Sequence, residues 1–477
     1  MAISDYKAGD IELKDITLFN YRGAPIDIKI IMEEFTIFHD LYANGIQCEI
    51  LVVDSNGLLE FMPIVGDETL MIKFRTPTDD RLRTYIFRVY KVDNKVKGND
   101  RTDNYVIKGI SQESINDRLI TVQKSYTDLP ADAIVKSIYN EYLKPNEKDY
   151  IIVKKKKLNI QTTHDNHHMV FTDQSPFKAI NTMCMEGQVK SQGKLTEYDF
   201  KNKKIKEEEY IDNSEASNFV FYESYDGWNF KTLDSLLVQD PVEDYYFTNA
   251  KVEQTNKDKT IKKYQIINSL EYNKQFDTLE SMSGGLFFNT VETIDPITKR
   301  FTVDNFTYNT DKGKISHLEK NRDLFSKESL FAKGGQSSHK YYMQSNIGEN
   351  YNKQIYLLNA ITTDPQIRNP REMHKWFKFD LASRVQLNNI VFTVGVPGNT
   401  DIEIGQVVNI HIPQNSGIEE YKKKQNLIYG NKFFVTAVRH TFNKQDNSFF
   451  TIFEAVKDVY AKKVIEETDV PIIEEVS

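Results

Sequence analysis

Strict alternation of apolar and polar residues constrains this chain more than any other feature of its sequence. In the stretch "LMIKFR" (70–75), every second residue is leucine, isoleucine or phenylalanine, and the segments 83–92 and 431–443 alternate in a similar way. Successive side chains of a β-strand point to opposite faces, so a period of two predicts half-buried strands. The chain also contains 26 tyrosines and 29 phenylalanines, which fit pleated sheets. We therefore predict a β-rich α+β protein.

The strand pattern occupies two regions on either side of a mixed one. In the mixed region we expect a helix over 128–143, capped by Asp128, and a second helix that begins after Ser175 and ends at Gly187. A hairpin should follow, turning at Asp226-Gly227. A three-stranded meander is expected over 405–458. The predicted domains are 1–125 (strands), 126–245 (a small α+β module), 246–460 (strands, with an insertion around 310–380) and 461–477 (an acidic, mobile tail).

Charge and composition exclude several classes of protein. The formal net charge is −8, whereas a protein that grips nucleic-acid phosphates normally carries an excess of basic residues. Cys48 and Cys184 are the only cysteines, so we expect free thiols in a reducing compartment. The first residues are acidic and lack an apolar core, and no run of 18 apolar residues occurs. We expect synthesis in the cytoplasm, without a signal peptide or a stable membrane association.

Two clusters resemble catalytic sites, and we favour a structural interpretation of both. The sequence "HDNHH" (164–168) places His164 and His168 four residues apart, but Asp and Asn disfavour the helix that would align them as zinc ligands. Asp67 and Glu68 are adjacent acids at the start of a strand, so their side chains point to opposite faces. The "KKKK" run (154–157) is interpreted as a solvated face. We predict no catalytic residue, no metal site and no cofactor.

Several segments, taken in order, resemble one family. They are "EEFTIFHDLYANGIQCEILVVDSNGLLEFMPIVGDETLMIKF" (33–74), "FYESYDGWNFKTLDSLL" (221–237), "GNTDIEIGQVVNI" (398–410) and "NKFFVTAVRHTFNKQDNSFFTIFEAVKD" (431–458). Together they resemble the baseplate central hub of contractile-tailed bacteriophages and the related late-control proteins. The resemblance covers most of 25–460, while 310–380 and the tail match nothing.

The resemblance implies a fold, partners and an assembly. Each chain would carry two antiparallel β-barrels like the tail tube subunit, flanking the mixed module. A homotrimer would present six barrels, joining the six-fold tube to the three-fold central spike and contacting other baseplate proteins in the virion tail. DNA would only pass through its lumen. The interface candidates, placed at strand ends, are Asp40, Leu41, Tyr42, Asn44, Gly66, Asp67, Glu68, Asn399, Asp401 and Gly405.

Alternatives to the phage hub remain open at this point. They are a tail-associated cell-wall hydrolase, the hub of a contractile injection system that is not a phage and, less favoured on charge, a nucleic-acid-binding module. For the hub, charge reversal at Asp67 and Glu68 is expected to weaken assembly and leave the monomer folded.

Overall fold

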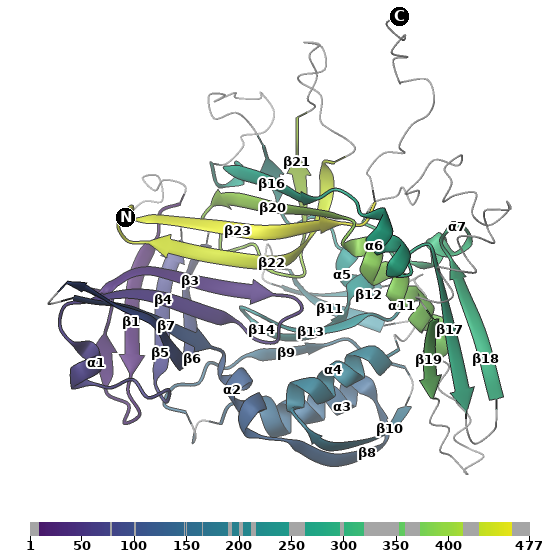
Figure 1. Ribbon diagram of the computed structural model, residues 1–477, viewed down its shortest axis with the longest axis horizontal. Helices are drawn as coiled ribbons and strands as arrows, with labels where there is room; N and C mark the ends of the chain where they lie inside the picture. Colours follow the sequence, from purple (N-terminus) through teal and green to yellow (C-terminus); the bar gives the residue numbers. More distant parts are fainter. Residues whose placement is uncertain are drawn as a thin grey trace, which may run out of the picture.

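The computed structural model describes most of the chain (Figure 1). Parts of the predicted insertion around 310–380, namely 319–352 and 358–372, and the predicted tail 461–477 lie outside the described residues. The described residues are 9–76, 79–99, 102–146, 148, 150–164, 166–188, 193–199, 204–210, 216–247, 263–295, 300–318, 353–357, 373–413 and 429–459.

One large, mainly antiparallel sheet of 13 strands dominates the molecule and confirms the β-rich α+β class. Its order is β16-β20-β23-β22-β3-β4-β7-β6-β5-β1-β2, and β21 joins β22 to β15. The N-terminal strands are β1 (Glu12–Phe19), β2 (Pro25–Asp27), β3 (Met32–Asp40), β4 (Gln47–Asp54), β5 (Thr69–Thr76), β6 (Asp79–Asn99) and β7 (Thr102–Ile110). The later strands are β15 (Asp244–Tyr246), β16 (Ser269–Lys274), β20 (Ile390–Pro397), β21 (Val407–His411), β22 (Asn431–Asn443) and β23 (Ser448–Lys457).

The two strand-rich regions expected as separate barrels are joined edge to edge. β3 and β22 pair antiparallel from Asp40 opposite Ala437 to Glu34 opposite Asn443. Figure 1 shows β4, β3, β22 and β23 side by side across the front of the molecule. At this seam the rings of Phe35 and Phe442 lie 5.4 Å apart on the buried face. The sheet therefore runs without a break from the first region to the last.

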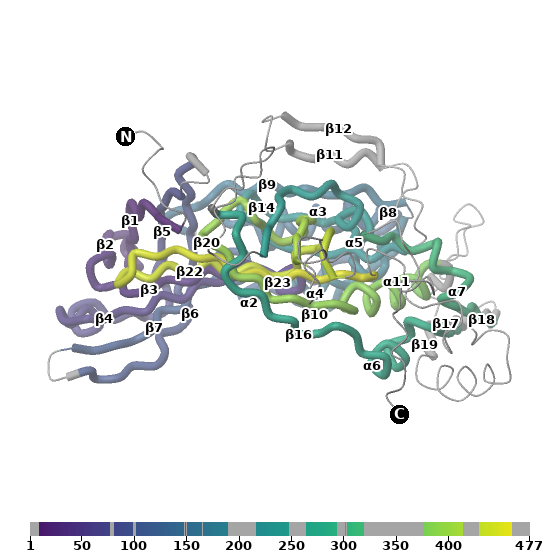
Figure 2. The backbone as a smooth tube through the Cα atoms, turned by 90° about the horizontal axis from the view of Figure 1, so that it is seen from above, coloured from purple at the N-terminus to yellow at the C-terminus, as the bar shows by residue number. Residues whose placement is uncertain are grey.

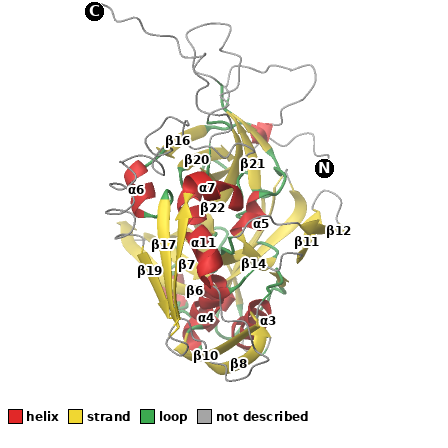
Figure 3. Ribbon diagram, turned by 90° about the vertical axis from the view of Figure 1, so that its right-hand side faces the viewer, coloured by secondary structure: helices red, strands yellow, loops and turns green. Residues whose placement is uncertain are grey.

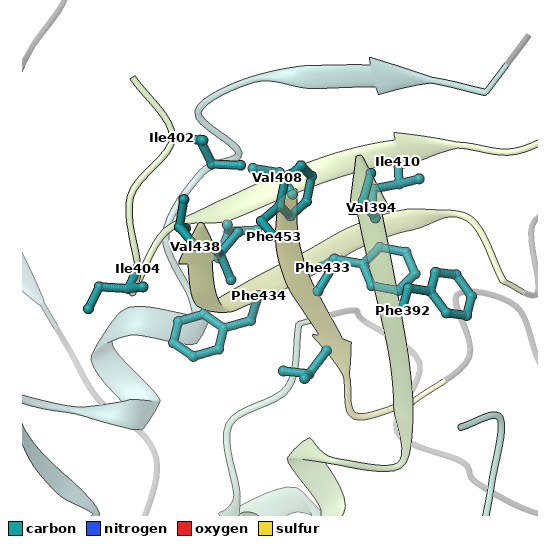
Figure 4. Close-up of a cluster of buried hydrophobic side chains, with 14 of the residues drawn as sticks. Phe392, Val394, Ile402, Ile404, Val408, Ile410, Phe433, Phe434, Val438 and Phe453 are labelled. Carbon is teal, nitrogen blue, oxygen red and sulfur yellow. The ribbon is translucent and has the colours of Figure 1, made fainter. Parts of the chain in front are cut away.

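Two hydrophobic cores lie along this sheet. One is built from the N-terminal strands together with Phe442 and Phe449. The other gathers the C-terminal strands, including Phe434, Val438 and Phe453 (Figure 4). Alternate residues of β23 are buried from Phe449 to Ala455, as the period of two predicts. In β22 two runs of consecutive residues, 433–436 and 440–442, are buried instead, so the alternation predicted there is not observed. Both strands contribute to both cores. Figure 2 shows these two strands running along the length of the molecule.

The mixed module has its own core, centred on the fully buried Trp228, which stacks on Phe221 at 4.9 Å. The predicted helix after Ser175 is confirmed, because the Ser175 hydroxyl accepts a hydrogen bond from the backbone N–H of Lys178 and Gly187 ends the helix. The module contains α2 (Gln112–Leu119), β8 (Val122–Pro130), α3 (Ala131–Ile138), a π-helical turn (Tyr139–Leu143), β9 (Lys157–Ile160), β10 (Asn166–Gln174), α4 (Pro176–Glu186), β13 (Phe219–Ser224), β14 (Gly227–Thr232) and α5 (Leu233–Leu237), and β11 (Gly193–Asp199) pairs with β12 (Lys204–Tyr210) beside it.

Two details of the module differ from the sequence prediction. The helix expected from Asp128 begins at Ala131, because β8 continues to Pro130 in its pairing with β10. The β13–β14 hairpin is confirmed, but its two-residue loop is Tyr225-Asp226, with Ser224 opposite Gly227. Gly227 is required for another reason: a Cβ there would lie 2.1 Å from the carbonyl oxygen of Lys157 in the neighbouring β9.

A smaller three-stranded sheet forms the right-hand end in Figure 1, and α11 packs against two of its strands, β17 and β18. Figure 3 shows α11 beside these strands, and the ring of Phe379 meets that of Phe306 at 5.8 Å. α11 was not predicted from the sequence. The elements of this region are α6 (Thr278–Ser283), β17 (Phe288–Asp295), β18 (Arg300–Thr307), α7 (Tyr308–Asp311), β19 (Lys353–Leu357) and α11 (Met373–Leu387). The remaining short elements of the described chain are α1 (Leu58–Phe61) and 3₁₀ turns at Lys263–Gln265 and Lys312–Lys314.

Both cysteines are free and buried, Cys48 in β4 and Cys184 in α4, as expected for a chain without a disulfide. Burial raises the pKa of the Cys184 thiol to about 12. No helix in the described part of the chain combines the length and apolar character needed to cross a membrane.

Candidate functional site

The first predicted contact loop, between β3 and β4, is anchored inside the chain. Leu41 is 1% exposed and belongs to the C-terminal core, and the Asn44 side chain donates to the carbonyl oxygen of Phe221 at 2.9 Å. Asp40 is exposed and accepts from the backbone N–H of Tyr42 at 2.8 Å. Tyr42 itself is 56% exposed. Of this group, Asp40 and Tyr42 have exposed side chains.

The second predicted loop, Gly66-Asp67-Glu68, separates its two acids as expected for a strand start. Glu68 is fully buried, and its carboxylate accepts the backbone N–H groups of Val65 at 3.0 Å and Gly66 at 2.9 Å. Asp67 is exposed and forms an ion pair with Arg88. Charge reversal at Glu68 would therefore disturb the monomer itself, so Asp67 is the position that tests a surface role.

Replacing Glu68 by alanine should lower the free energy of unfolding by about 1.5 to 3 kcal/mol, because two backbone N–H groups lose a charged acceptor. Asp67→Ala should cost less than about 1 kcal/mol, because this ion pair is exposed on the aspartate side. Urea unfolding followed by circular dichroism measures both values. Equal losses would contradict the capping role of Glu68.

The third predicted loop, 399–405, lies against β6 and the mixed module. Asn399 is 1% exposed, and its side chain donates to the Tyr245 hydroxyl at 3.0 Å. Gly405 has a φ of +79°, and a Cβ at this position would lie 2.7 Å from the Tyr222 hydroxyl. The exposed Asp401 pairs with the buried Arg83 at 3.3 Å. The loop is thus a contact between parts of one chain, with the Asp401 carboxylate at its outer side.

The first and third loops meet at a buried ionic cluster, which we call the junction and define as Arg83, Glu113, Lys154, Lys156, Glu223 and Glu403. The ammonium of Lys156 lies 2.5 Å from a carboxylate oxygen of Glu113 and 2.5 Å from one of Glu223. The other oxygen of Glu223 accepts the backbone N–H of Ile46 at 2.9 Å. The cluster therefore connects α2 and the β13–β14 hairpin to the loop after β3.

Burial and neighbouring charges shift the pKa values within the junction. Burial raises the pKa of Glu113, and Lys156 opposes that rise without cancelling it. The carboxylate of Glu223 adds to the rise at Glu113, because a like charge nearby disfavours the ionised form. Burial alone would lower the pKa of Lys156, but Glu113 and Glu223 outweigh this effect, so the pKa of Lys156 is raised.

Tyr225, at the tip of the β13–β14 hairpin, occupies the other side of the junction. Its ring lies 3.4 Å from the ammonium of Lys154 and 4.7 Å from the Arg83 guanidinium carbon. Its hydroxyl accepts the backbone N–H of Thr84 at 2.9 Å. Burial, followed by the nearby Lys156, lowers the pKa of Lys154 to about 8. Cation–π contacts of this kind are strongest where water is excluded, so the hairpin tip fixes the module to β6.

The junction was not predicted from the sequence, and the interpretation of "KKKK" as a solvated face was wrong for half of the run. Lys155 and Lys157 are exposed, whereas Lys154 and Lys156 turn inward. The alternation of exposed and inward-facing lysines in this run has a period of two, which is the signal that could have predicted the burial of Lys154 and Lys156. Four identical residues do not show which pair faces inward, because that depends on the acids of α2 and β13, which are distant in sequence.

The "HDNHH" cluster does not converge on a metal. Its last three residues open β10, where His167 is buried and His168 is exposed, so the strand turns these rings apart. Within the described residues, no group of three His, Cys, Asp or Glu side chains is arranged to hold a metal ion. The carboxylates of the junction are engaged by Lys156 and Arg83. These ion pairs connect β6, α2 and the β13–β14 hairpin with the loops that follow β3 and β20.

The continuous sheet, with two cores in series and a mixed module fixed beneath them, is similar to the fold of a solved tail protein. The 43 kDa tail protein of prophage MuSo2 from Shewanella oneidensis aligns over 93% of this chain and 98% of its own, with a TM-score of 0.50 and 8% sequence identity. This likeness establishes the fold across nearly the whole of both chains.

Two further structures align over most of the chain. A tail protein from Neisseria meningitidis MC58 covers 94% of this chain and 98% of its own, at 10% identity and a TM-score of 0.49. A type VI secretion component from E. coli, described as similar to the T4 tail proteins gp27 and gp5, covers 90% and 73%, at 9% identity and a TM-score of 0.38. No protein-family model and no curated protein matches the sequence.

Proposed function

We propose that this chain is a non-enzymatic structural protein of a phage tail, and specifically the homotrimeric baseplate hub between the six-fold tube and the three-fold spike. The observation that carries the proposal is the fold shared with the MuSo2 tail protein over nearly the full length of both chains. The order of hub-like segments along the sequence supports the finer assignment. Its location would be the virion tail, with assembly in the host cytoplasm.

The two cores support the finer description of two tube-like barrel units per chain. Each core lies behind its own group of strands, and these groups meet at the β3–β22 seam. Three chains would place six such groups around one axis, which would meet a six-fold tube and leave a three-fold face for the spike. In this proposal the domain boundaries remain near 125, 245 and 460, with the mixed module between the units.

Light scattering gives the decisive measurement, applied to the purified protein alone and with a candidate spike protein. We expect three times the 55.5 kDa chain mass, either alone or once the spike is added. Asp67→Lys and Tyr42→Ala should reduce the trimer fraction, whereas Asp240→Lys, at another exposed acid, should leave it unchanged. A strict monomer that also ignores the spike would contradict the proposal.

The hydrolase alternative had its best sequence support in "HDNHH", and the two histidines that open β10 point to opposite faces of that strand. A hub from a contractile injection system that is not a phage would share the same mechanics, and no contact in the described chain favours it over the phage hub.

A further inference from the structure

Two buried histidines face each other at the seam where β3 pairs with β22 (Figure 1). His39 is 3% exposed and His440 is 2% exposed, and their rings pack edge to face with centroids 5.7 Å apart. The ring of Tyr85, on β6, meets that of His39 at 6.0 Å. Histidine is the side chain whose ordinary pKa lies closest to neutral pH, so a buried pair of this kind is a candidate pH sensor.

The pair occupies the layer between the two hydrophobic cores. Along β3, Ile37 belongs to the N-terminal core and Leu41, just past the strand end, belongs to the C-terminal core. Along β22, Phe442 belongs to the N-terminal core and Val438 to the C-terminal core. In each case a histidine stands at the alternate position between the two apolar residues. The seam therefore carries two titratable rings where a continuous core would carry apolar side chains.

The hydrogen bonds around the pair suit neutral rings. The Thr451 hydroxyl donates to the carbonyl oxygen of Asn399 at 3.2 Å and accepts the backbone N–H of Asn399 at 3.0 Å. Because its one hydrogen is used, this hydroxyl accepts the Nδ1–H of His440 at 3.0 Å. Neither ring nitrogen of His39 has a hydrogen-bond partner among the described residues. A second proton on His39 would therefore find no acceptor among these residues.

The charged groups that act on the pair from the surrounding elements of the described chain are cations. Arg83, on β6, opposes protonation of both rings, and Lys154, before β9, opposes it at His39. The carboxylates of Asp401 and Glu403, in the loop after β20, are paired with Arg83. They reduce the effect of that cation and do not contact the histidines.

Both histidines are therefore held neutral in the closed seam. Burial, followed by Arg83 and Lys154, lowers the pKa of His39 to about 3. Burial, followed by His39 and Arg83, lowers the pKa of His440 well below its ordinary range. Tyr85 supplies no negative charge, because burial raises the pKa of its hydroxyl.

We propose that the β3–β22 seam is an acid-sensitive joint, which opens between the two cores as His39 and His440 take up protons. On opening, the pairing of β3 with β22 would break and both rings would reach water. A group that binds protons more weakly in the closed state favours opening as the pH falls below its ordinary pKa, which is about 6.5 for histidine. The seam is thus most stable above this pH. The inference is independent of the hub assignment, because it uses only the seam and the groups packed around it.

Hydrogen exchange of the full chain, followed by mass spectrometry, tests the proposal. After correction for the pH dependence of chemical exchange, amides in peptides 32–40 and 431–443 should open more often at pH 5 than at pH 7. The expected increase is about 20-fold for each histidine that is protonated on opening. Peptide 176–186, from α4 in the core of the mixed module, is the internal reference and should change by less than about threefold.

Single substitutions identify the groups responsible. His39→Phe keeps an aromatic ring beside Tyr85 but cannot take up a proton, and His440→Asn keeps an N–H for Thr451. Each should reduce the pH effect on the seam by about 20-fold. His168→Phe, at an exposed histidine of β10, is the matched control and should leave the effect unchanged.

A cross-link gives a check that leaves both histidines in place. The hydroxyl oxygens of Thr36 and Thr441 lie 3.2 Å apart on paired strands, so cysteines at both positions are within reach of a disulfide. The double variant Thr36→Cys, Thr441→Cys should lose the pH effect when oxidised and regain it when reduced.

Three results would overturn the proposal. The first is seam exchange that does not respond to pH in the unaltered protein. The second is an equal response of the seam and the α4 reference, because acid would then unfold the chain as a whole. The third is a pH effect that persists in full in the His39→Phe, His440→Asn double variant or in the oxidised cross-linked protein.

Discussion

Replacing Lys156 by methionine should lower the free energy of unfolding by about 3 to 5 kcal/mol. The variant keeps the length and apolar stem of the side chain but removes the only ammonium between Glu113 and Glu223, which are almost fully buried. Two buried carboxylates without a cation must either remain charged in an apolar environment or bind protons. Urea unfolding near pH 7 measures the loss, which should shrink at lower pH as the carboxylates become neutral.

The neighbouring lysine provides a matched control. Lys155→Met alters the same chemistry at an exposed position one residue away and should change stability by less than about 0.5 kcal/mol. The triple variant Lys156→Met, Glu113→Gln, Glu223→Gln should recover part of the loss, because it removes the unpaired charges. If Lys156→Met costs no more than Lys155→Met, the junction does not hold the chain together in the way described.

Asp380→Asn should stabilise the protein, and the gain should grow with pH. Asp380, on α11, is 2% exposed and accepts the backbone N–H of Ser217 at 2.6 Å. Burial raises its pKa from 3.8 to about 8, an effect that this N–H and Arg384 only partly oppose. A carboxyl group whose pKa is raised on folding favours the folded state least at high pH. The wild-type protein therefore loses stability as the pH rises from about 4 to about 8.

The expected difference between the variant and the wild-type protein increases by up to about 1.4 kcal/mol per pH unit, or about 4 kcal/mol between pH 5 and pH 8. Unfolding free energies at these two pH values measure it. Asp240→Asn, at an exposed aspartate, is the control and should change stability by less than about 0.5 kcal/mol. A constant gain for Asp380→Asn at both pH values would rule out titration of this carboxyl group as the cause.

Local signals predicted much of the fold. The caps at Ser175 and Gly187 defined α4, and alternation placed β5, β22 and β23 within one or two residues of their observed ends. β6 was predicted over 83–92 and extends from Asp79 to Asn99. These features depend on interactions between residues close in sequence, so a short stretch of sequence is enough to predict them. The same holds for Glu68, whose position before a strand indicated a polar turn.

The contacts between distant segments could not be predicted in this way. Alternation says that β3 has a buried face, but it does not say that β22 will be its neighbour, because the pairing energy depends on both strands. The same limit applies to Lys156, whose burial depends on acids contributed by α2 and β13. The predicted contact loops were located correctly at strand ends, yet Leu41, Glu68 and Asn399 proved to be buried within the chain.

The seam between β3 and β22 also sets an order of events during synthesis. Asp40 ends β3 and Asn431 begins β22, so 391 positions separate them (431 − 40). At about 5 to 20 residues per second, the ribosome needs roughly 20 to 80 seconds to produce the partner of β3. During that interval the N-terminal strands can pair among themselves, while the edge of β3 that pairs with β22 in the folded protein has no partner. Each nascent chain therefore carries an open strand edge for most of its translation, and crowded ribosomes on one message would expose such edges to one another.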